Sequence, residues 1–155
     1  MKLISQILLK DHIMLDMDVP DKFSAISKLL DTLKSSSDII DLDRFAKDIE
    51  RREKDFPTGL ENGTALPHAR TTAVSDLIMA FGRSEKGVDF GAPDGKPSKL
   101  VFLFGVPRDE VKDYLKTIAQ LSRLLKEHSF RDKLLDANNP NEIIALIREA
   151  EKKLN

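Results

Sequence analysis

Two continuous runs of apolar residues constrain the fold of this 155-residue chain more than any other feature of its sequence. The runs are LIMAF at 77–81 and LVFLF at 100–104. Both are far shorter than the ~18 residues that a membrane-spanning helix needs. Short runs that are apolar on both faces are typical of strands covered on both sides. The sequence therefore predicts buried strands in a sheet with helices on each face.

Periodic patterns predict the elements around these two strands. Apolar residues alternate with aspartates over 13–19, which favours a strand with one face in water, and residues 64–66 fit a further short strand. Apolar residues recur at helical spacing over 21–34 and 41–53. The chain after Pro107 has the same spacing almost to its end, which predicts helices only.

Length and composition are those of one ordinary globular domain. The chain is 41% hydrophobic and 33% charged, which argues against disorder. No repeat, low-complexity segment or linker rich in proline, glycine and serine divides it. We therefore predict a single domain over residues 1–155, of the α/β or α+β class, with about four to five strands and about five helices.

Charge and cysteine content exclude several classes of function. Lys plus Arg is 25 and Asp plus Glu is 26, so no basic excess favours nucleic acid or an anionic membrane. Cysteine is absent, which excludes disulfides, thiolate metal sites and cysteine nucleophiles. The apolar start of the chain is broken by Lys10 and Asp11, unlike a signal peptide. We expect a cytoplasmic protein without a nucleic-acid partner or membrane insertion.

The three histidines lie far apart in the sequence and give no short metal-ligand pattern, so no metal site is predicted. We expect His12 in the turn before the strand at residue 13. We expect His128 at the end of a long helix, where its charge suits the helix dipole. Neither is a candidate for function.

His68 has different surroundings. It follows Pro67, which has a fixed φ and no N–H, and the small residues 63–65 precede both. A histidine at a strand end beside such a loop can present one ring nitrogen outward while a hydrogen bond holds the other. Neutral imidazole is a usable nucleophile near pH 7. A histidine that caps a turn explains the same segment equally well, so both interpretations stay open on these residues alone.

Arg52 continues the apolar stripe of the helix predicted over 41–53. Its side chain either lies over the edge of the core or points its guanidinium into a pocket, where it suits phosphate or carboxylate. The chain after Arg52 leads through a glycine-containing loop to His68, which favours the second use. No P-loop, GxGxxG, GxSxG or HExxH motif is present, so nothing favours hydrolase or oxidoreductase chemistry.

The segment TGLENGTALPH at 58–68 resembles the active-site signature of fructose/mannitol-type enzyme IIA domains. These domains belong to the bacterial phosphoenolpyruvate-dependent phosphotransferase system, and their superfamily includes the nitrogen-regulatory IIA proteins. The resemblance extends to Arg-Glu at 52–53, to VDFGAPDGKPSKLVFLFGVP at 88–107 and to the helix that follows. It is strongest over residues 20–155, and its TG-x-x-NG-x-A-x-PH pattern is specific.

The resemblance implies a mixed sheet flanked by helices and a phosphoryl group on His68, received from HPr or an HPr-like carrier. It implies that Arg52 is the active-site arginine, and no cofactor is expected. The family's second histidine aligns with Tyr114, which is a departure. A tyrosine near its reference pKa of ~10 offers only a neutral O–H donor at pH 7. We expect Arg52, backbone N–H groups, Thr58 and Tyr114 to stabilise the phosphoryl oxygens.

Three functions remain open on this basis. The first is a nitrogen-regulatory IIA phosphocarrier that binds regulatory targets according to its phosphorylation state. The second is a sugar-specific IIA that passes phosphate to a IIB component, and the third is a binding-only regulator that has lost transfer. The carrier-binding face is expected around His68, with Leu66, Phe56 and Leu60 as candidate apolar contacts.

Overall fold

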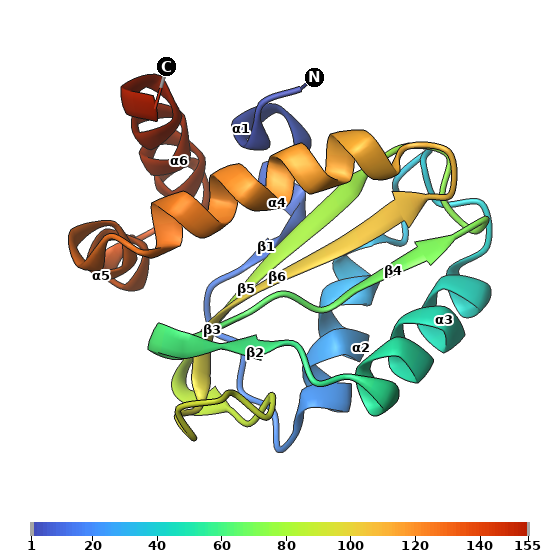
Figure 1. The fold of residues 1–155 in the computed structure, drawn as a ribbon, viewed down its shortest axis with the longest axis horizontal. Coiled ribbons are helices and arrows are strands. Elements are labelled where there is room, and N and C mark those ends of the chain that lie inside the picture. The colour runs from blue at the N-terminus through green and yellow to red at the C-terminus, as the bar shows by residue number, and fades with distance from the viewer. Residues whose placement is uncertain (1, 155) are drawn as a thin grey trace.

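The two apolar runs form the centre of one sheet in the computed structural model, which describes residues 2–154 (Figure 1). Strand β5 (Ile78–Val88) pairs antiparallel with β6 (Ser98–Pro107), and Phe81 faces Phe102 in the register. A β-bulge interrupts the pairing between Arg83 and Val88. The prediction of two buried strands is confirmed, and both are longer than the apolar runs that revealed them.

Four shorter strands complete a mixed sheet. Strand β1 (Ile13–Met14) is parallel to β5, and β2 (Gly59–Leu60) is antiparallel to β3 (Thr64–Ala65). Both β3 and β4 (His68–Thr71) run parallel to β6 along the same edge. The strand order is β1-β5-β6-β3-β2, with β4 also paired to β6. The chain from 64 to 71 thus follows one edge of β6 in two pieces.

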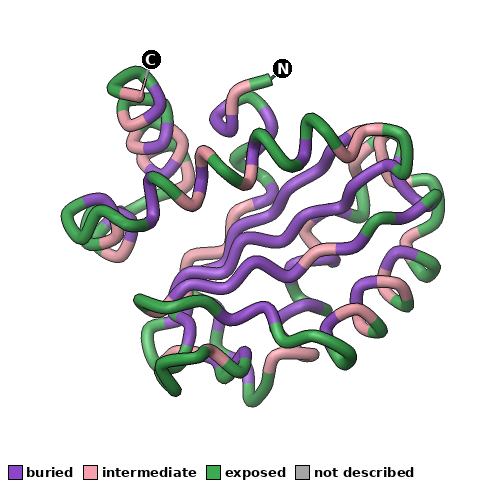
Figure 2. The backbone as a smooth tube through the Cα atoms, in the orientation of Figure 1, coloured by how far each residue is buried: buried purple, intermediate pink, exposed green. Residues whose placement is uncertain are grey.

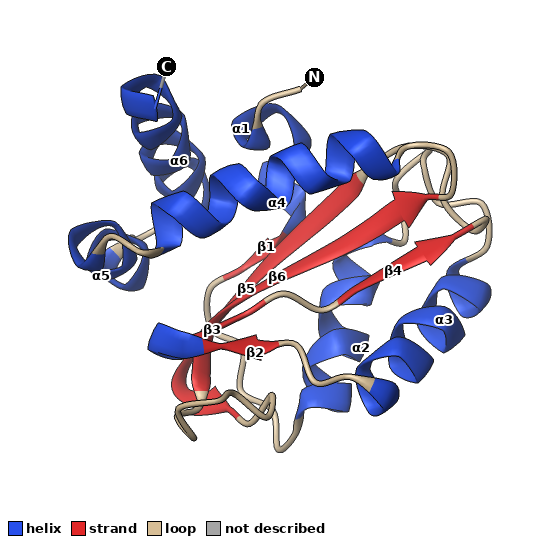
Figure 3. Ribbon diagram, in the orientation of Figure 1, coloured by secondary structure: helices blue, strands red, loops and turns tan. Residues whose placement is uncertain are grey.

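Helices cover both faces of the sheet, as Figures 1 and 3 show. One face carries the helices from the two ends of the chain, namely α1 (Ile4–Ile7), α4 (Val111–Leu125), α5 (His128–Asp136) and α6 (Pro140–Leu154). The other face carries α2 (Lys22–Leu33) and α3 (Leu42–Asp55). Two 3-10 turns, η1 (Lys10–His12) and η2 (Glu61–Gly63), complete the described elements. No helix within residues 2–154 is long and apolar enough to cross a bilayer.

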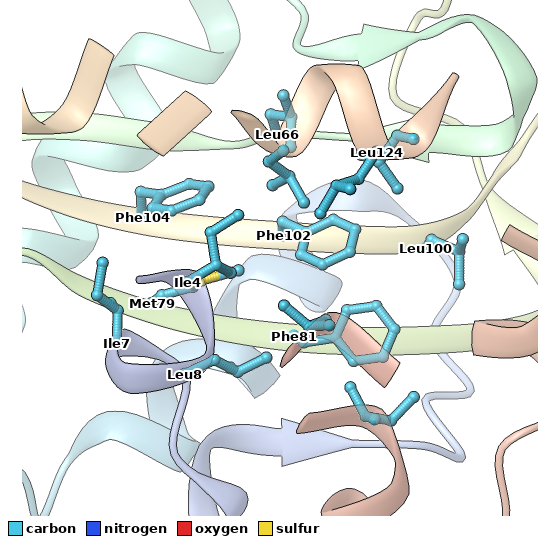
Figure 4. Close-up of a cluster of buried hydrophobic side chains, with 14 of the residues drawn as sticks. Ile4, Ile7, Leu8, Leu66, Met79, Phe81, Leu100, Phe102, Phe104 and Leu124 are labelled. Carbon is cyan, nitrogen blue, oxygen red and sulfur yellow. The ribbon is translucent and has the colours of Figure 1, made fainter. Parts of the chain in front are cut away.

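Alternate residues of the central strands pack in two separate cores, since successive side chains point to opposite faces of a sheet. Phe81, Phe102 and Phe104 pack beneath α1 and α4 to α6, as the close-up in Figure 4 shows. Ala80 and Leu103 face α2 and α3 instead. Figure 2 shows the resulting pattern, with buried backbone along β5 and β6 and exposure on the outer helix surfaces.

A buried carboxylate ties the two ends of the chain together. Glu151 of α6 accepts hydrogen bonds from the backbone N–H groups of Ile4 and Ser5, at 2.7 and 3.0 Å. These N–H groups belong to the first turn of α1, where no partner exists within the helix. The contact explains how a four-residue helix, too short to be stable alone, holds its place against α6.

Several predictions need correction. The described chain has six α-helices and six strands, and α1, β2 and β4 were not predicted. Only Ile13–Met14 of the segment 13–19 is a strand, although its aspartates are exposed and Met17 and Val19 are buried. His128 begins α5 instead of ending a long helix, so it does not interact with a helix C-terminus as expected. The structure confirms His12 in the turn before β1.

Candidate functional site

His68 is the first residue of β4, at the point where the chain rejoins β6 after a two-residue interruption, Leu66 and Pro67. Pro67 has no N–H to donate to the ladder, but its carbonyl accepts a hydrogen bond from Phe104 at 3.0 Å. The backbone around His68 is therefore fixed by the central strand of the sheet. The side chain itself is half-buried, so one part of the ring remains open to solvent.

A hydrogen bond fixes the tautomer of His68. The ring Nδ1 lies 2.8 Å from the carbonyl oxygen of Leu66. A carbonyl oxygen only accepts, so Nδ1 carries the proton and donates it. A neutral imidazole has one N–H proton. Because that proton is on Nδ1, Nε2 has a free electron pair. The geometry makes Nε2 the nucleophilic atom of this site.

The loop before His68 is shaped by backbone conformations that few residues adopt. Asn62 and Gly63 have φ values of 68° and 72°, both in the left-handed region. The N–H of Asn62 donates to the carboxylate of Asp94, in the turn between β5 and β6. Gly59 lies so close to the same connection that a Cβ would come within 2.7 Å of the carbonyl oxygen of Phe90. Gly59 of the motif thus allows close backbone approach, and Gly63 allows the left-handed turn.

Arg52 lies in the last turn of α3, close to the site. One of its guanidinium nitrogens donates to the carbonyl of Phe56 at 3.0 Å, and the guanidinium carbon lies 5.1 Å from the centre of the Phe56 ring. Its positive charge lowers the pKa of both His68 and Tyr114. The structure therefore brings Arg52 and His68 together, and most donors of the guanidinium fork have no protein acceptor among the described residues.

Tyr114 covers one side of the imidazole. The two ring centres are 5.5 Å apart, and the phenol ring also meets Phe104 edge-on at 5.7 Å. Burial raises the pKa of Tyr114 to about 12, against a smaller opposite effect of Arg52. Tyr114 therefore stays neutral throughout the physiological range and offers the site a hydroxyl group without charge.

Burial is also the main influence on His68, whose pKa it lowers from the ordinary histidine value. Arg52 acts in the same direction because a second positive charge nearby is unfavourable. The hydrogen bond to Leu66 and the charge of Glu53 oppose these effects. The balance keeps the imidazole neutral at pH 7, which is the form that acts as a nucleophile.

Thr58 is hydrogen-bonded to Glu53 through both its side chain and its backbone. Its hydroxyl donates to Oε1 of Glu53, and its backbone N–H donates to Oε2 of the same carboxylate at 2.9 Å. The residue is buried. In this structure the hydroxyl of Thr58 is therefore engaged inside the protein, and a contact of Thr58 with phosphoryl oxygens stays a prediction.

Glu53 is the residue of this site that sequence reasoning missed. Only 1% of its surface is exposed, and Lys22 from α2 reaches its Oε2 at 3.3 Å. The sequence did contain an indication, since Glu53 follows the core residue Ile49 by four positions and so lies on the same helix stripe. A carboxylate on a core-facing stripe needs buried donors, and the structure supplies three.

The apolar residues near the site differ in exposure. Phe56 is 64% exposed, Leu115 beside Tyr114 is 55% exposed, and Leu60 is 38% exposed. Leu66 is buried in the core beneath α4, so it is unavailable as the contact that the sequence suggested. Within residues 2–154, no cluster of histidine and carboxylate side chains is arranged to hold a metal ion.

Comparison with known proteins identifies the chemistry that this arrangement resembles. Residues 6–150 match the family described as "Phosphoenolpyruvate-dependent sugar phosphotransferase system, EIIA 2". A fructose-specific EIIA component of Haloferax volcanii is 38% identical over 83% of each chain. A fructose-specific EIIABC component of Bacillus subtilis is 32% identical over 96% of this chain, which spans only 24% of that longer protein.

Solved structures give the same picture. The nitrogen regulatory protein IIA-Ntr of Neisseria meningitidis superposes with a TM-score of 0.85 and 32% identity, over 93% of this chain and 98% of that one. The mannitol IIA in a complex with phosphorylated IIB from Escherichia coli has a TM-score of 0.77 at 22% identity, which shows a shared fold. That alignment covers 90% of this chain and 95% of the other.

We predict that the His68 imidazole titrates below the ordinary histidine value of ~6.5. Because folding then favours the neutral ring, His68 contributes stability that is lost as the pH falls below about 6.5. NMR titration of the ring measures the midpoint directly. Urea unfolding at about pH 7.5 and about pH 5.5 should show a smaller loss of stability in His68→Gln than in the wild type. A midpoint above 6.5, or equal losses in both proteins, contradicts this prediction.

Proposed function

The chain belongs to the EIIA 2 family of the phosphoenolpyruvate-dependent sugar phosphotransferase system, and on this basis we propose that it carries a phosphoryl group on Nε2 of His68. The observation that carries the proposal is the 2.8 Å hydrogen bond from Nδ1 to Leu66, which leaves Nε2 free. The donor is HPr or an HPr-like carrier. The proposal also states that residues 1–155 form one IIA domain and that this domain acts in the cytoplasm.

The transfer step follows from the ring's hydrogen bonding. The Nε2 electron pair forms the new N–P bond while the bond between phosphorus and the carrier's histidine nitrogen breaks, and that nitrogen keeps the bonding pair. The Nδ1 proton stays in place, so the phosphorylated ring is positively charged. The Leu66 carbonyl oxygen lies 2.8 Å from that N–H and stabilises the charge. The same contact thus assists acceptance and prepares the ring to give the group away.

Arg52 supplies the positive charge for the phosphoryl oxygens. Guanidinium binds such oxygens through two parallel N–H groups, and Phe56 occupies one donor of Arg52. The contact with the Phe56 carbonyl and ring restricts the side chain before the carrier arrives. Thr58 contributes through the position of its loop, because its hydroxyl is bound to Glu53.

Two kinds of relative support two different destinations for the phosphoryl group. Similarity along nearly the whole of both chains to a nitrogen regulatory IIA supports a regulatory role, in which a charge added at His68 changes the binding of target proteins. The 38% identity to a fructose-specific EIIA component supports the second candidate, a relay to a IIB component. Binding of targets without transfer is the remaining alternative.

Phosphorylation of purified protein tests the carrier function. Phosphoenolpyruvate, enzyme I and HPr should place acid-labile phosphate on the wild type and none on His68→Ala. His128→Ala is the matched control because this histidine is far more exposed, with 80% of its side chain accessible, yet should not be labelled. Absence of label on the wild type beside an active control IIA favours the binding-only alternative. Label that persists on His68→Ala removes the proposal.

Added IIB proteins distinguish the two transfer functions. Rapid loss of label from the phosphorylated chain to a fructose-type IIB indicates a sugar relay. Stable label in the presence of all candidate IIB proteins, with phosphorylation-dependent binding of another protein, indicates a regulatory endpoint.

We predict that Arg52→Lys slows transfer to His68 on the order of tenfold to a hundredfold, since lysine keeps the charge but loses the planar pair of donors. Arg51→Lys is the matched control, because Arg51 is the neighbouring exposed arginine. Rapid-quench measurement of phosphoryl transfer from HPr gives both rates. Equal rates in the two variants would show that Arg52 has no special role.

We propose that the Tyr114 hydroxyl contacts the phosphoryl group and that a neutral phenol makes transfer slower, or the phosphoprotein longer lived, than a second histidine would. Tyr114→His should therefore raise the transfer rate or shorten the phosphoprotein lifetime. Tyr114→Phe keeps the ring against Phe104 and removes only the hydroxyl. This variant separates the packing of the ring from the contact of the hydroxyl with the phosphoryl group. Forward and reverse rates that are unchanged in Tyr114→His eliminate this role.

A further inference from the structure

A buried carboxylate stands at the start of a continuous series of hydrogen bonds that ends on the His68 ring. Glu53 accepts from both the hydroxyl and the backbone N–H of Thr58. The carbonyl of Thr58 accepts from the N–H of Leu66 at 3.1 Å. The carbonyl of Leu66 in turn accepts from Nδ1 of His68 at 2.8 Å. Each residue of the series is thus held by the one before it.

The last bond of this series depends on where Leu66 lies. The Leu66 N–H and the Leu66 carbonyl lie in adjacent rigid peptide planes that meet at the Leu66 Cα, so anchoring the first plane leaves only rotation about that Cα to redirect the carbonyl. Residues 64–65 pair with β6 and Pro67 accepts from Phe104, which fixes the segment from the sheet side. The bond from Leu66 to Thr58 fixes it from the loop side, and Glu53 holds Thr58 by both its backbone and its side chain.

Donors from two elements surround the Glu53 carboxylate. Lys22 approaches Oε2 from α2, with 19% of the lysine side chain exposed. A buried carboxylate with an ion partner and two further donors satisfies most of its lone pairs, which offsets the cost of removing it from water. The charged groups that act on His68 are Arg52 and Glu53, the ring of Tyr114 lies beside its imidazole, and Lys22 is paired with Glu53.

We propose that Glu53 is a positioning residue for phosphoryl transfer, which acts through Thr58 and Leu66 to hold the His68 ring with its proton on Nδ1 and Nε2 toward the carrier. This inference rests on the proposed function of His68 as phosphoryl acceptor. A purely structural role would change only the overall stability of the protein. Loss of Glu53 should in addition change the tautomer of the His68 imidazole.

Three variants separate the parts of this series. Glu53→Gln keeps the shape of the side chain but removes its charge and one acceptor. Thr58→Val keeps the volume and the backbone N–H but removes the hydroxyl, with no change in charge, and Thr58→Ser restores the hydroxyl. Glu151→Gln is the matched control for a buried carboxylate that accepts two backbone N–H groups, since it lies at α1 instead of the site.

Thr117→Val is the matched control for the threonine. Thr117 is buried like Thr58, but its hydroxyl has no hydrogen-bond partner among residues 2–154, so nothing in the series depends on it. Both controls report the effect of altering a buried polar side chain on stability alone.

Two measurements on each protein test the proposal. Nitrogen-15 NMR of the unphosphorylated chain reports the tautomer of His68. Transfer from HPr reports kcat and KM separately. We expect Glu53→Gln and Thr58→Val to mix the two tautomers and to lower kcat on the order of tenfold to a hundredfold, with KM for HPr little changed. Thr58→Ser, Glu151→Gln and Thr117→Val should keep the Nδ1–H tautomer and nearly the wild-type kcat.

The proposal is overturned if Glu53→Gln and Thr58→Val retain the Nδ1–H tautomer and differ from their matched controls by less than about twofold in kcat. If Glu53→Gln does not fold, the comparison of Thr58→Val with Thr58→Ser decides the question without a charge change. If the wild type accepts no phosphate, the proposed function fails, whereas the NMR result still shows whether Glu53 positions the ring.

Discussion

The hydrogen bond from Nδ1 of His68 to the Leu66 carbonyl is the contact on which the proposed phosphoryl transfer depends. Imidazole has two nitrogens that exchange roles freely in water, and a phosphoryl acceptor needs one of them to keep its electron pair. A backbone carbonyl fixes that choice more firmly than a side chain does, because the sheet immobilises it. The interrupted edge formed by β3, Pro67 and β4 therefore gives the histidine both its position and its tautomer.

The electrostatic surroundings of the ring oppose its protonation but favour a phosphoryl group. Burial and Arg52 lower the pKa of His68, so the free protein keeps a neutral nucleophile. In the proposed phosphorylated state the balance would reverse, because the anionic oxygens would attract Arg52 while the positive ring would use the Leu66 carbonyl more strongly. Tyr114 adds no charge to the site of the free protein, since burial raises its pKa to about 12.

The centre of the sheet, the main helices, and His68 and Arg52 as site candidates could be predicted from the sequence, each for a different physical reason. Uninterrupted apolar runs required strands covered on both faces, and helical spacing required α2 and α3. Strand β4 was missed because its sequence, HART, shows no alternation of apolar residues. Its pairing with β6 is made by the backbone, which leaves no pattern in the side chains. The partner of Thr58 was missed for a related reason. A hydroxyl has many available acceptors, and only the folded chain shows that a buried Glu53 accepts its hydrogen bond.

Glu53 and Arg52 illustrate how adjacent residues of opposite charge serve one site from different directions. Positions 52 and 53 both follow Ile49 at helical spacing, but α3 ends at Asp55, so the two side chains leave the helix where it meets the motif loop. The carboxylate turns inward to Thr58 and Lys22, whereas the guanidinium remains beside Phe56 at the surface. The charge that would attract a phosphoryl group is thus accessible, and the charge that would repel it is buried and already neutralised by its own donors. This separation allows an acidic residue to hold the loop without weakening the attraction for phosphate.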